Sequence, residues 1–280
     1  MIFLSDEATI DVFGGKMYFR STRIQPERNT LLFLHGLGDS GLTFMEAFQQ
    51  SALQKFNILA PDFLGFGNSS AASEGGYLFS AQIKRIVDLL DSLSIASVHL
   101  IGHSMGGVIG TQLCTQQPGR VNSFINVEGT LTPSDRFITS RVIDADQQGR
   151  FRQWFRDDFI GRIVVDWGKK RMSCRRYLIS LSRCLPEAFL ESAKEIYKMG
   201  EISADSSDGE SESAKAYRAL LLAKVYCWGT ESLSDESQKY LANTILLNHA
   251  FEGAAHWVMQ DRREAFYNFL AGFLAGLGAM

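Results

Sequence analysis

Cysteine and proline are scarce in this sequence, which contains 4 cysteines and 5 prolines among 280 residues. The cysteines, Cys114, Cys174, Cys184 and Cys227, are far apart and form no CxxC pair. This spacing indicates neither a zinc site nor a dense disulfide framework. We expect four reduced thiols packed inside the protein.

Long hydrophobic runs are lacking as well. The longest apolar stretch, residues 265–280, includes Asn268 and is shorter than the roughly 20 residues that span a bilayer. It predicts a packed terminal helix. Residues 1–7 lack the basic and apolar regions of a secretory signal. Together these features predict a cytoplasmic protein without a membrane span.

Neither sign of charge dominates, since 28 lysines and arginines stand against 31 aspartates and glutamates, for a formal net charge of -3. Such a balance gives no general attraction to nucleic-acid phosphates or anionic lipids, so we expect no nucleic-acid partner. The sequence has no GxxxxGK[ST] loop, Gly65 and Gly67 lack the third glycine of a dinucleotide fingerprint, and no metal motif occurs. We therefore expect neither a cofactor nor a metal ion.

The composition is that of a globular protein, with 45% hydrophobic and 21% charged residues. Short apolar runs alternate with helical patterns over residues 82–93 and 105–117. Such runs predict strands buried on both faces of a mostly parallel sheet, and their alternation with helices predicts an α/β fold. The predicted strands are residues 31–34, 57–60, 98–101, 124–127, 225–228 and 244–247.

The alternation stops over residues 133–216, which carry many aromatic residues and arginines but no clear buried strand. We interpret this segment as a helical cap inserted between two parts of an α/β core, residues 1–132 and 217–280. Within it, residues 201–213 are rich in Ser, Asp, Glu and Gly and predict a mobile loop.

The side chains of the insertion allow more than one interpretation. Its aromatic residues either wall an apolar acyl pocket or pack the cap onto the core, and both roles can hold at once. The arginines from Arg150 to Arg171 are interspersed with aspartates, which predicts a solvated surface of mixed charge. The aromatic residues are Trp154, Phe155, Phe159 and Trp167.

The strongest local signal is the G-x-S-x-G pattern at residues 102–106. It follows the predicted strand 98–101 and precedes a helical pattern, which is the order that a nucleophile elbow requires. In such an elbow a strained turn lifts the serine hydroxyl above the sheet edge. The residues two before and two after the serine must be small, and Gly102 and Gly106 meet this demand. Ser104 is therefore the candidate nucleophile.

A second predicted strand, residues 31–34, ends in the His-Gly turn at residues 35–38. A backbone amide in such a turn can join the amide that follows the nucleophile to form an oxyanion hole. We assign the two N–H groups to Leu37 and Met105. His35 is then a structural residue of the turn.

With these motifs the sequence resembles the α/β-hydrolase superfamily. The resemblance rests on HGLGDSG at residues 35–41, PDFLGFGNS at 61–69, GHSMGG at 102–107 and GAAHW at 253–257. These motifs span most of the chain in a specific order, and only the insertion has no recognisable counterpart. The resemblance implies an α/β-hydrolase fold, a triad in the order serine, acid, histidine, and a structural role for Asp62.

A serine hydroxyl needs an imidazole that takes its proton and later delivers it to the leaving group. Of the 5 histidines, His256 stands in a small-residue loop and matches the late catalytic histidine of the family. His103 adjoins the nucleophile, resembles the common family variant GHSxG, and is interpreted as structural. His99 and His249 lie in or beside predicted strands and are interpreted as packed or exposed.

The triad acid departs from the commonest family pattern. Residues 229–232 read Gly-Thr-Glu-Ser, with Ser232 where the acid usually stands. One strand earlier, Glu128 ends a predicted strand, a placement that resembles many haloalkane dehalogenases and some polyketide-chain thioesterases. We therefore assign the acid to Glu128, with Glu231 and Asp235 as the alternatives.

The predicted reaction follows from the nucleophile. Haloalkane dehalogenases attack carbon–halogen bonds with an aspartate, whereas Ser104 implies acyl transfer. The sequence predicts a serine hydrolase of the carboxylesterase, thioesterase or lipase-like kind. Its substrate is a small or medium acyl compound, whose ester, thioester or lactone bond is cleaved through an acyl-enzyme. Two alternatives stay open, a carbon–carbon bond hydrolase or acyltransferase of the same fold, and a slow-turnover ligand receptor or binding module.

Overall fold

The computed structural model describes residues 5–204, 206 and 209–277. The strands of this part of the chain are β1 (Asp6–Val12), β2 (Gly15–Ser21), β3 (Thr30–Leu34), β4 (Asn57–Pro61), β5 (Val98–His103), β6 (Val121–Val127), β7 (Ala223–Gly229) and β8 (Asn248–Phe251). They form an 8-stranded sheet in the order β1-β2-β4-β3-β5-β6-β7-β8. The β1–β2 and β2–β4 pairs are antiparallel, and the other pairs are parallel.

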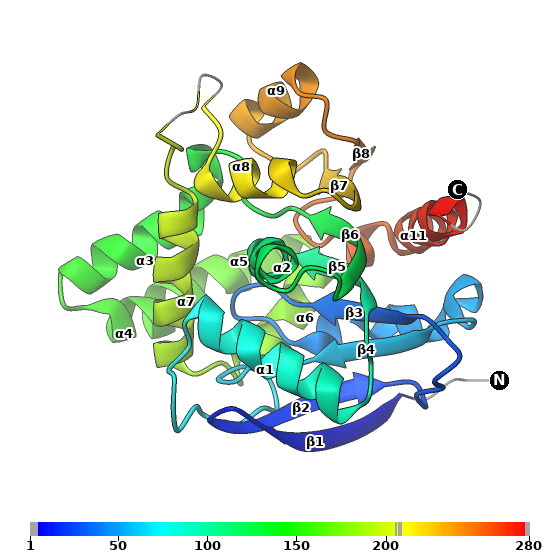
Figure 1. The fold of residues 1–280 in the computed structure, drawn as a ribbon. Helices are drawn as coiled ribbons and strands as arrows, with labels where there is room; N and C mark the ends of the chain where they lie inside the picture. The colour runs from blue at the N-terminus through cyan, green and yellow to red at the C-terminus, as the bar shows by residue number, and fades with distance from the viewer. Residues whose placement is uncertain (1–4, 205, 207–208, 278–280) are drawn as a thin grey trace.

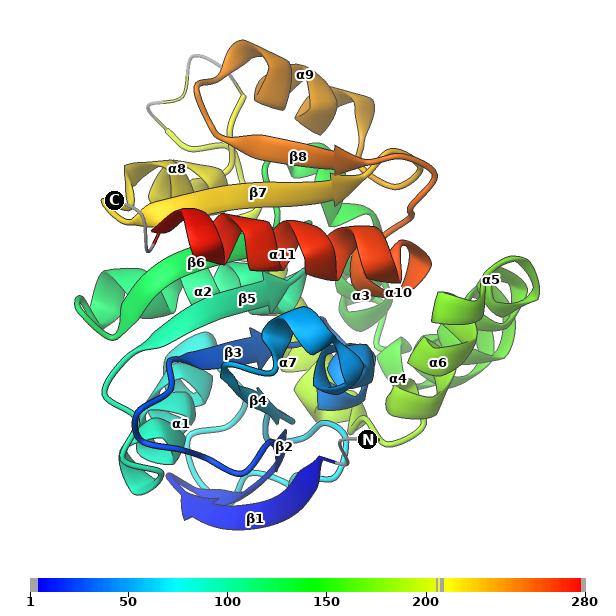
Figure 2. The same cartoon turned by 90° about the vertical axis from the view of Figure 1, so that its right-hand side faces the viewer.

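The predicted α/β fold class is confirmed. β3 and β4 are buried at every residue, as expected of strands that are covered on both faces of the sheet. The five predicted strands from residues 31–34 to 225–228 lie within β3, β4, β5, β6 and β7. Because β3, β5, β6 and β7 are parallel, their carboxyl ends meet at one edge of the sheet (Figure 2).

The prediction of a strand at residues 244–247 is wrong. β8 begins at Asn248, opposite Tyr226 of β7, and Ile245 is fully exposed. At this outer edge an apolar run need not be covered, so hydrophobicity misplaces the strand by a few residues. At the other edge, β1 is exposed along most of its length, and the sequence therefore offers no apolar run that predicts it.

Helices cover both faces of the sheet (Figures 1 and 2). One face carries α1 (Phe79–Ser92), α2 (Met105–Gln116) and α8 (Glu212–Ala219). The other carries the 3-10 helices η1 (Gly41–Gln49) and η2 (Ser51–Leu53) together with α10 (Val258–Asp261) and α11 (Arg263–Leu277). Arg262 separates α10 from α11. A further helix, α9 (Asp235–Asn243), connects β7 to β8.

Between β6 and β7 the chain forms a group of helices beyond the carboxyl ends of the parallel strands (Figure 2). They are η3 (Pro133–Arg136), α3 (Phe137–Gln147), α4 (Phe151–Gln153), the π-helix η4 (Trp154–Val164), α5 (Val165–Lys170), α6 (Met172–Leu181) and α7 (Pro186–Met199). The next helix, α8, instead packs against α2 on the face of the sheet. The helices from η3 to α7 therefore lie at the sheet edge where the nucleophile elbow opens.

The loop predicted at residues 201–213 is only partly as expected. Residues 205, 207 and 208 lie outside the described residues. On either side of them, Ile202 and Ser211 form an antiparallel bridge, and α8 already begins at Glu212. Glu210 is buried, because its carboxylate pairs with Arg218. The C-terminal end of the predicted loop is thus wrong, since Glu210, which composition assigns to solvent, is buried and pairs with the half-exposed Arg218.

The four cysteines are free and buried, as predicted from their spacing. Within the described ranges, none of the helices combines the length and the apolar character that crossing a bilayer requires. Residues 278–280 of the predicted terminal helix lie outside the described part, and α11 packs through Phe266, Tyr267, Leu270 and Leu274.

Candidate active site

Ser104 stands at the turn between β5 and α2 with φ 52° and ψ −115°, a left-handed conformation that a residue with a side chain rarely adopts. The flanking glycines are required by close approach. A Cβ atom on Gly106 would lie 2.1 Å from the carbonyl oxygen of Leu34, and one on Gly102 would lie 2.4 Å from that of Gly106. The backbone N–H of Ser104 donates to Val127 of β6 at 2.8 Å. This geometry is that of the predicted nucleophile elbow.

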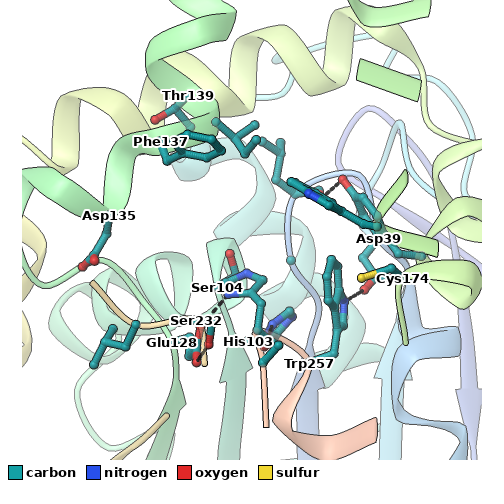
Figure 3. A pocket seen from close by; sticks show the side chains of 18 of the residues that line it. Asp39, His103, Ser104, Glu128, Asp135, Phe137, Thr139, Cys174, Ser232 and Trp257 are labelled. Carbon is teal, nitrogen blue, oxygen red and sulfur yellow. Dashed lines mark hydrogen bonds and ion pairs between the residues drawn. The ribbon is translucent and has the colours of Figure 1, made fainter. Parts of the chain in front are cut away.

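Glu128 precedes the insertion in the sequence and His256 follows it, yet their side chains are in contact. Glu128 follows β6 and His256 follows β8, and His256 Nδ1 lies 2.6 Å from Glu128 Oε2. The second carboxylate oxygen, Oε1, accepts hydrogen bonds from the Gly229 N–H at 2.7 Å and from Ser232 Oγ at 2.5 Å. The Glu128 side chain is only 4% exposed. Two donors besides the imidazole therefore hold a buried carboxylate, whose partner Ser232 is seen in Figure 3.

Two opposing effects act on the pKa of His256. Burial lowers the pKa, whereas the hydrogen bond and the negative charge of Glu128 raise it, and the net pKa lies above the ordinary histidine value. The charges of Asp135 and Asp39 act in the same direction as Glu128. The site therefore stabilises a protonated imidazole, which a general base becomes once it has taken a proton.

The predicted oxyanion turn lies beside the elbow. A Cβ atom on Gly36 would be 3.2 Å from the Cβ of Ser104, so this turn passes directly over the nucleophile. The carbonyl of Leu37 accepts a hydrogen bond from Tyr177 Oη at 2.9 Å. Among the described residues, no acceptor is bound to the N–H of Leu37 or to that of Met105 at the start of α2. Both donors are thus available to a developing negative charge.

The remaining histidines have structural partners. His103 Nε2 lies 2.8 Å from the carbonyl oxygen of His256, and because a carbonyl can only accept, Nε2 carries the proton. Burial and the neighbouring His256 lower the pKa of His103 well below its ordinary value, so this ring supports the His256 backbone in its neutral form. His35 is buried and accepts the N–H of Phe63. His99 bonds to Ser123, and His249 stacks on an aromatic ring of α11.

Within the described ranges, the carboxylate bound to the imidazole is that of Glu128, and neither alternative acid forms a hydrogen bond with His256. Glu231 pairs with Arg171 of the insertion, and Asp235 is exposed at the start of α9. Arg171 itself is only 27% exposed and departs from the predicted mixed-charge surface. The other arginines there, such as Arg156, form exposed ion pairs as predicted.

Ser104, Glu128, His256 and Leu37 line a common cavity of about 460 Å³ between the sheet edge and the insertion (Figure 3). This volume lies within the ordinary range for small-molecule sites, about 300–1,000 Å³. The insertion supplies most of the apolar wall, namely Phe137, Ile138, Phe159, Trp167, Cys174, Tyr177, Phe189 and Ile196.

The aromatic residues of the insertion divide between the two predicted roles. Phe159 and Trp167 line the cavity. Trp154 and Phe155 are buried behind them, with the Trp154 ring centroid 5.3 Å from that of Phe159. Both interpretations of this cluster therefore hold for different members of it.

Several residues that support the site carry little sequence signal. The sequence shows only that Ser232 stands where the acid usually lies. In the structure its hydroxyl donates a hydrogen bond to Glu128. Asp39 accepts the indole N–H of Trp257 at 2.9 Å and so joins the oxyanion turn to the residue after His256. Asp62, interpreted as structural, accepts hydrogen bonds from Arg20 and from the Gly41 N–H.

Residues 29–259 match the protein family described as alpha/beta hydrolase fold. The chain is 31% identical over 113 residues to a candidate carbamate hydrolase, RutD, of Stutzerimonas stutzeri, and this match covers 40% of the chain and 42% of that protein. The chain spans less than half the length of the curated relatives that it matches.

Two solved structures resemble the chain along nearly its whole length. The haloalkane dehalogenase DbeA of Bradyrhizobium elkani has a TM-score of 0.75 at 21% identity, with 98% of this chain and 99% of that chain covered. The enol-lactonase of Burkholderia xenovorans LB400 has a TM-score of 0.72 at 18% identity, with 96% and 100% covered. At such identities the likeness concerns the fold alone.

Proposed function

The chain belongs to the α/β-hydrolase fold family, and from this membership we propose that it is a serine hydrolase acting on a small or medium acyl compound. The bond cleaved is an ester, thioester or lactone. One observation carries the proposal, the 2.6 Å contact between His256 Nδ1 and Glu128 Oε2 in a cavity that Ser104 also lines. A fold of this family hosts many reactions, so the reaction is argued from these side chains.

The first step of the proposed mechanism acylates Ser104. With Nδ1–H donating to Glu128, the Nε2 lone pair of His256 takes the hydroxyl proton while Oγ attacks the substrate carbonyl. The carbonyl oxygen becomes negative and is bound by the N–H groups of Leu37 and Met105. When the tetrahedral intermediate collapses, His256 gives its proton to the departing alkoxide or thiolate, and an acyl-serine ester remains.

The second step releases the acid. A water molecule gives a proton to His256 Nε2 and attacks the acyl-serine carbonyl through the same oxyanion hole. Collapse breaks the bond to Oγ, which takes the proton back from His256. The products are a carboxylic acid and the free serine, so no cofactor takes part in this scheme.

The walls of the cavity support an apolar acyl group. Phe159 and Phe189 are buried, and both line the cavity with Trp167 and Ile196. Such side chains favour a substrate whose acyl part gives up apolar surface to the protein. In this proposal the helices from η3 to α7, within the predicted insertion 133–216, serve as a helical cap, whereas α8, which crosses the predicted boundary at residue 216, packs on the core.

A fluorophosphonate probe tests the proposal, because it phosphonylates a serine only when the serine is activated. We expect intact-protein mass spectrometry to find one adduct on the wild type and none on Ser104→Ala or His256→Ala. His249→Ala is the matched control, since His249 lies on β8 outside the cavity, and it should be labelled like the wild type.

Hydrolysis of a panel of esters, thioesters and lactones of increasing acyl length then identifies the bond. Folded wild-type protein that takes no label would contradict the proposal. Labelling without turnover of any ester-type compound would instead favour the receptor or the carbon–carbon bond hydrolase.

A further inference from the structure

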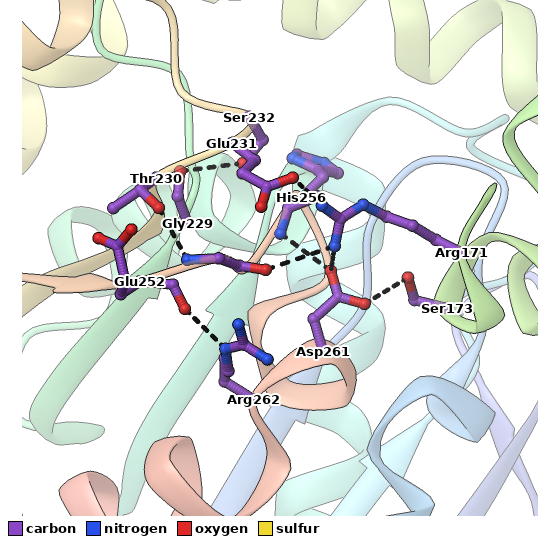
Figure 4. A network of polar contacts seen from close by, with 12 residues as sticks. Arg171, Ser173, Gly229, Thr230, Glu231, Ser232, Glu252, His256, Asp261 and Arg262 are labelled. Carbon is purple, nitrogen blue, oxygen red and sulfur yellow. Dashed lines mark hydrogen bonds and ion pairs between the residues drawn. The ribbon is translucent and has the colours of Figure 1, made fainter.

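One side chain of the insertion contacts both loops that hold the acid and the base. Arg171 lies between α5 and α6 with an extended backbone, and its guanidinium reaches down to the core (Figure 4). Nη2 pairs with Glu231 in the loop after β7, and Nη1 lies 3.2 Å from Asp261 Oδ2 at the end of α10. Both sides of the guanidinium are thus taken up by carboxylates of the protein itself.

Asp261 connects Arg171 to the loop that carries His256. Its side chain is 9% exposed, and Oδ2 also accepts the N–H of Ala255, the residue before His256, at 2.9 Å. The other oxygen, Oδ1, accepts a hydrogen bond from Ser173 at 2.7 Å. Two residues of the insertion therefore hold a carboxylate that in turn holds the backbone next to the base.

The two core loops that Arg171 joins are also bound to each other. The N–H of Glu231 donates to the carbonyl of Ala254 at 2.9 Å, and Thr230 Oγ1 accepts the N–H of Gly253 at 2.9 Å. The first of these loops begins with Gly229, whose N–H binds Glu128. A single arginine therefore contacts an assembly that fixes both partners of the 2.6 Å acid–base contact.

The other end of the same segment binds the oxyanion turn. Tyr177 Oη donates to the carbonyl of Leu37 at 2.9 Å, and Ser180 Oγ lies 2.9 Å from Ser40 Oγ. The contact is tight, because a Cβ atom on Gly38 would lie 2.6 Å from Tyr177 Oη. Residues 171–180 thus touch the loop of the base at one end and the oxyanion turn at the other.

We propose that residues 171–180 are a positioning segment, in which Arg171 and Ser173 fix the loop of His256 and Tyr177 and Ser180 fix the oxyanion turn. The inference rests on the proposed function for the reaction that is positioned. The physical reason is that catalysis requires aligned groups, and a misplacement of about 1 Å costs about 100-fold in rate. The insertion accordingly assembles the catalytic groups in addition to walling the cavity.

The first experiment observes the base directly. The His256 Nδ1 proton, held between two atoms 2.6 Å apart, should give a strongly downfield proton NMR signal that is missing in His256→Gln. We expect Arg171→Gln to lose or broaden this signal and Arg171→Lys to retain part of it. Arg156→Gln, which removes an exposed arginine of the same insertion, is the matched control and should keep it.

The second experiment measures the rate of fluorophosphonate labelling. We expect Arg171→Gln to react about 10- to 100-fold more slowly than the wild type, with Arg171→Lys in between. Tyr177→Phe should also slow the labelling, but it should keep the downfield signal, because it removes only the hydroxyl that binds Leu37 and keeps the ring that packs against Trp257. A general loss of stability would affect both the labelling rate and the downfield signal, and would not slow the labelling while the signal is kept.

The outcomes distinguish this inference from the proposed function. If Arg171→Gln keeps both the downfield signal and the wild-type rate, the positioning role is wrong. If the wild type takes no label but Arg171→Gln still loses the signal, the serine hydrolase proposal fails and the positioning of His256 stands. Should Arg171→Gln not fold, Ser173→Ala removes one hydrogen bond to Asp261 and must weaken the signal for the inference to hold.

Discussion

Ser232 Oγ lies 2.5 Å from Glu128 Oε1 and donates its proton to that carboxylate, although the two residues are 104 positions apart in the sequence. Ser232 stands where the acid is expected from the resemblance to the family, and its hydroxyl instead binds the carboxylate of Glu128, the acid that we propose. The other oxygen of Glu128 faces His256. The side chain at the usual position of the acid thus binds the carboxylate that contacts His256.

Removing the charge of this acid should nearly abolish reactivity. We expect Glu128→Gln to lower the rate of serine labelling and of ester hydrolysis by about 10⁴-fold, because the amide no longer stabilises the imidazolium and can bind the wrong tautomer. Asp235→Asn, at an exposed position on α9, should keep the wild-type rate. A severe loss in Asp235→Asn with an active Glu128→Gln would move the acid to the loop after β7.

The convergence of Ser232 and Glu128 also predicts a rescue. In the Glu128→Gln background, Ser232→Asp introduces a carboxylate close to the one that was removed, so we expect it to restore at least about tenfold of the lost rate. The measurement is the pseudo-first-order rate of fluorophosphonate labelling of the two variants at one pH. Equal rates would mean that a carboxylate at position 232 cannot reach the imidazole.

The pKa of His256 predicts the pH dependence of labelling. Only the neutral imidazole can take the serine proton, and Glu128 raises the pKa, so the rate should rise with pH through a midpoint above about 6.5. Glu128→Gln removes the negative charge and should lower the midpoint of its residual activity. Labelling rates from pH 5 to pH 9 give both midpoints, and a higher midpoint in the variant would contradict the assignment.

We expect the protonation of His103 to lower the stability of the protein in acid. Burial is the main cause that lowers the pKa of His103 in the folded protein. Below about pH 6.5 the unfolded chain therefore binds a proton at His103 that the folded protein does not bind. The free energy of unfolding should therefore fall by up to about 1.4 kcal/mol for each pH unit below that value. His103→Gln keeps a donor for the His256 carbonyl but does not titrate.

Urea unfolding of both proteins at several pH values between 5 and 7.5 checks this prediction. The slope of unfolding free energy against pH should be smaller in His103→Gln than in the wild type. Parallel slopes would show that His103 does not contribute to the acid sensitivity.

The core strands were predictable because they are covered on both faces. In β3 and β4 every residue is buried, and hydrophobicity alone then marks the strand. At the edges of the sheet this relation fails. β1 is mostly exposed, and near β8 the fully exposed Ile245 belongs to an apolar run that is not a strand.

The same distinction holds for the candidate site. Some of its residues can be identified from the neighbouring sequence, and others depend on contacts with residues far away in the sequence. Ser104 and Glu128 each follow a buried strand directly, so the strand pattern alone predicts that both lie at the carboxyl edge of the sheet, whereas their left-handed backbone conformation is seen only in the structure. The sequence predicts a surface arginine at Arg171, because nothing near it in the sequence identifies Asp261 or Glu231 as its partners. Contacts between the insertion and the core depend on how the helices pack, which no local pattern contains.

The positions of the proposed triad along the chain have a consequence during biosynthesis. Ser104 and Glu128 follow the neighbouring strands β5 and β6, whereas His256 comes only after the insertion. A ribosome therefore produces the hydroxyl and the carboxylate first and the imidazole last. A serine without its base is a weak nucleophile. Ser104 of a nascent chain is therefore unreactive until the segment after β8 packs against the core and brings His256 to the site. In the proposed mechanism, the activated nucleophile therefore forms only after the chain has been made as far as His256.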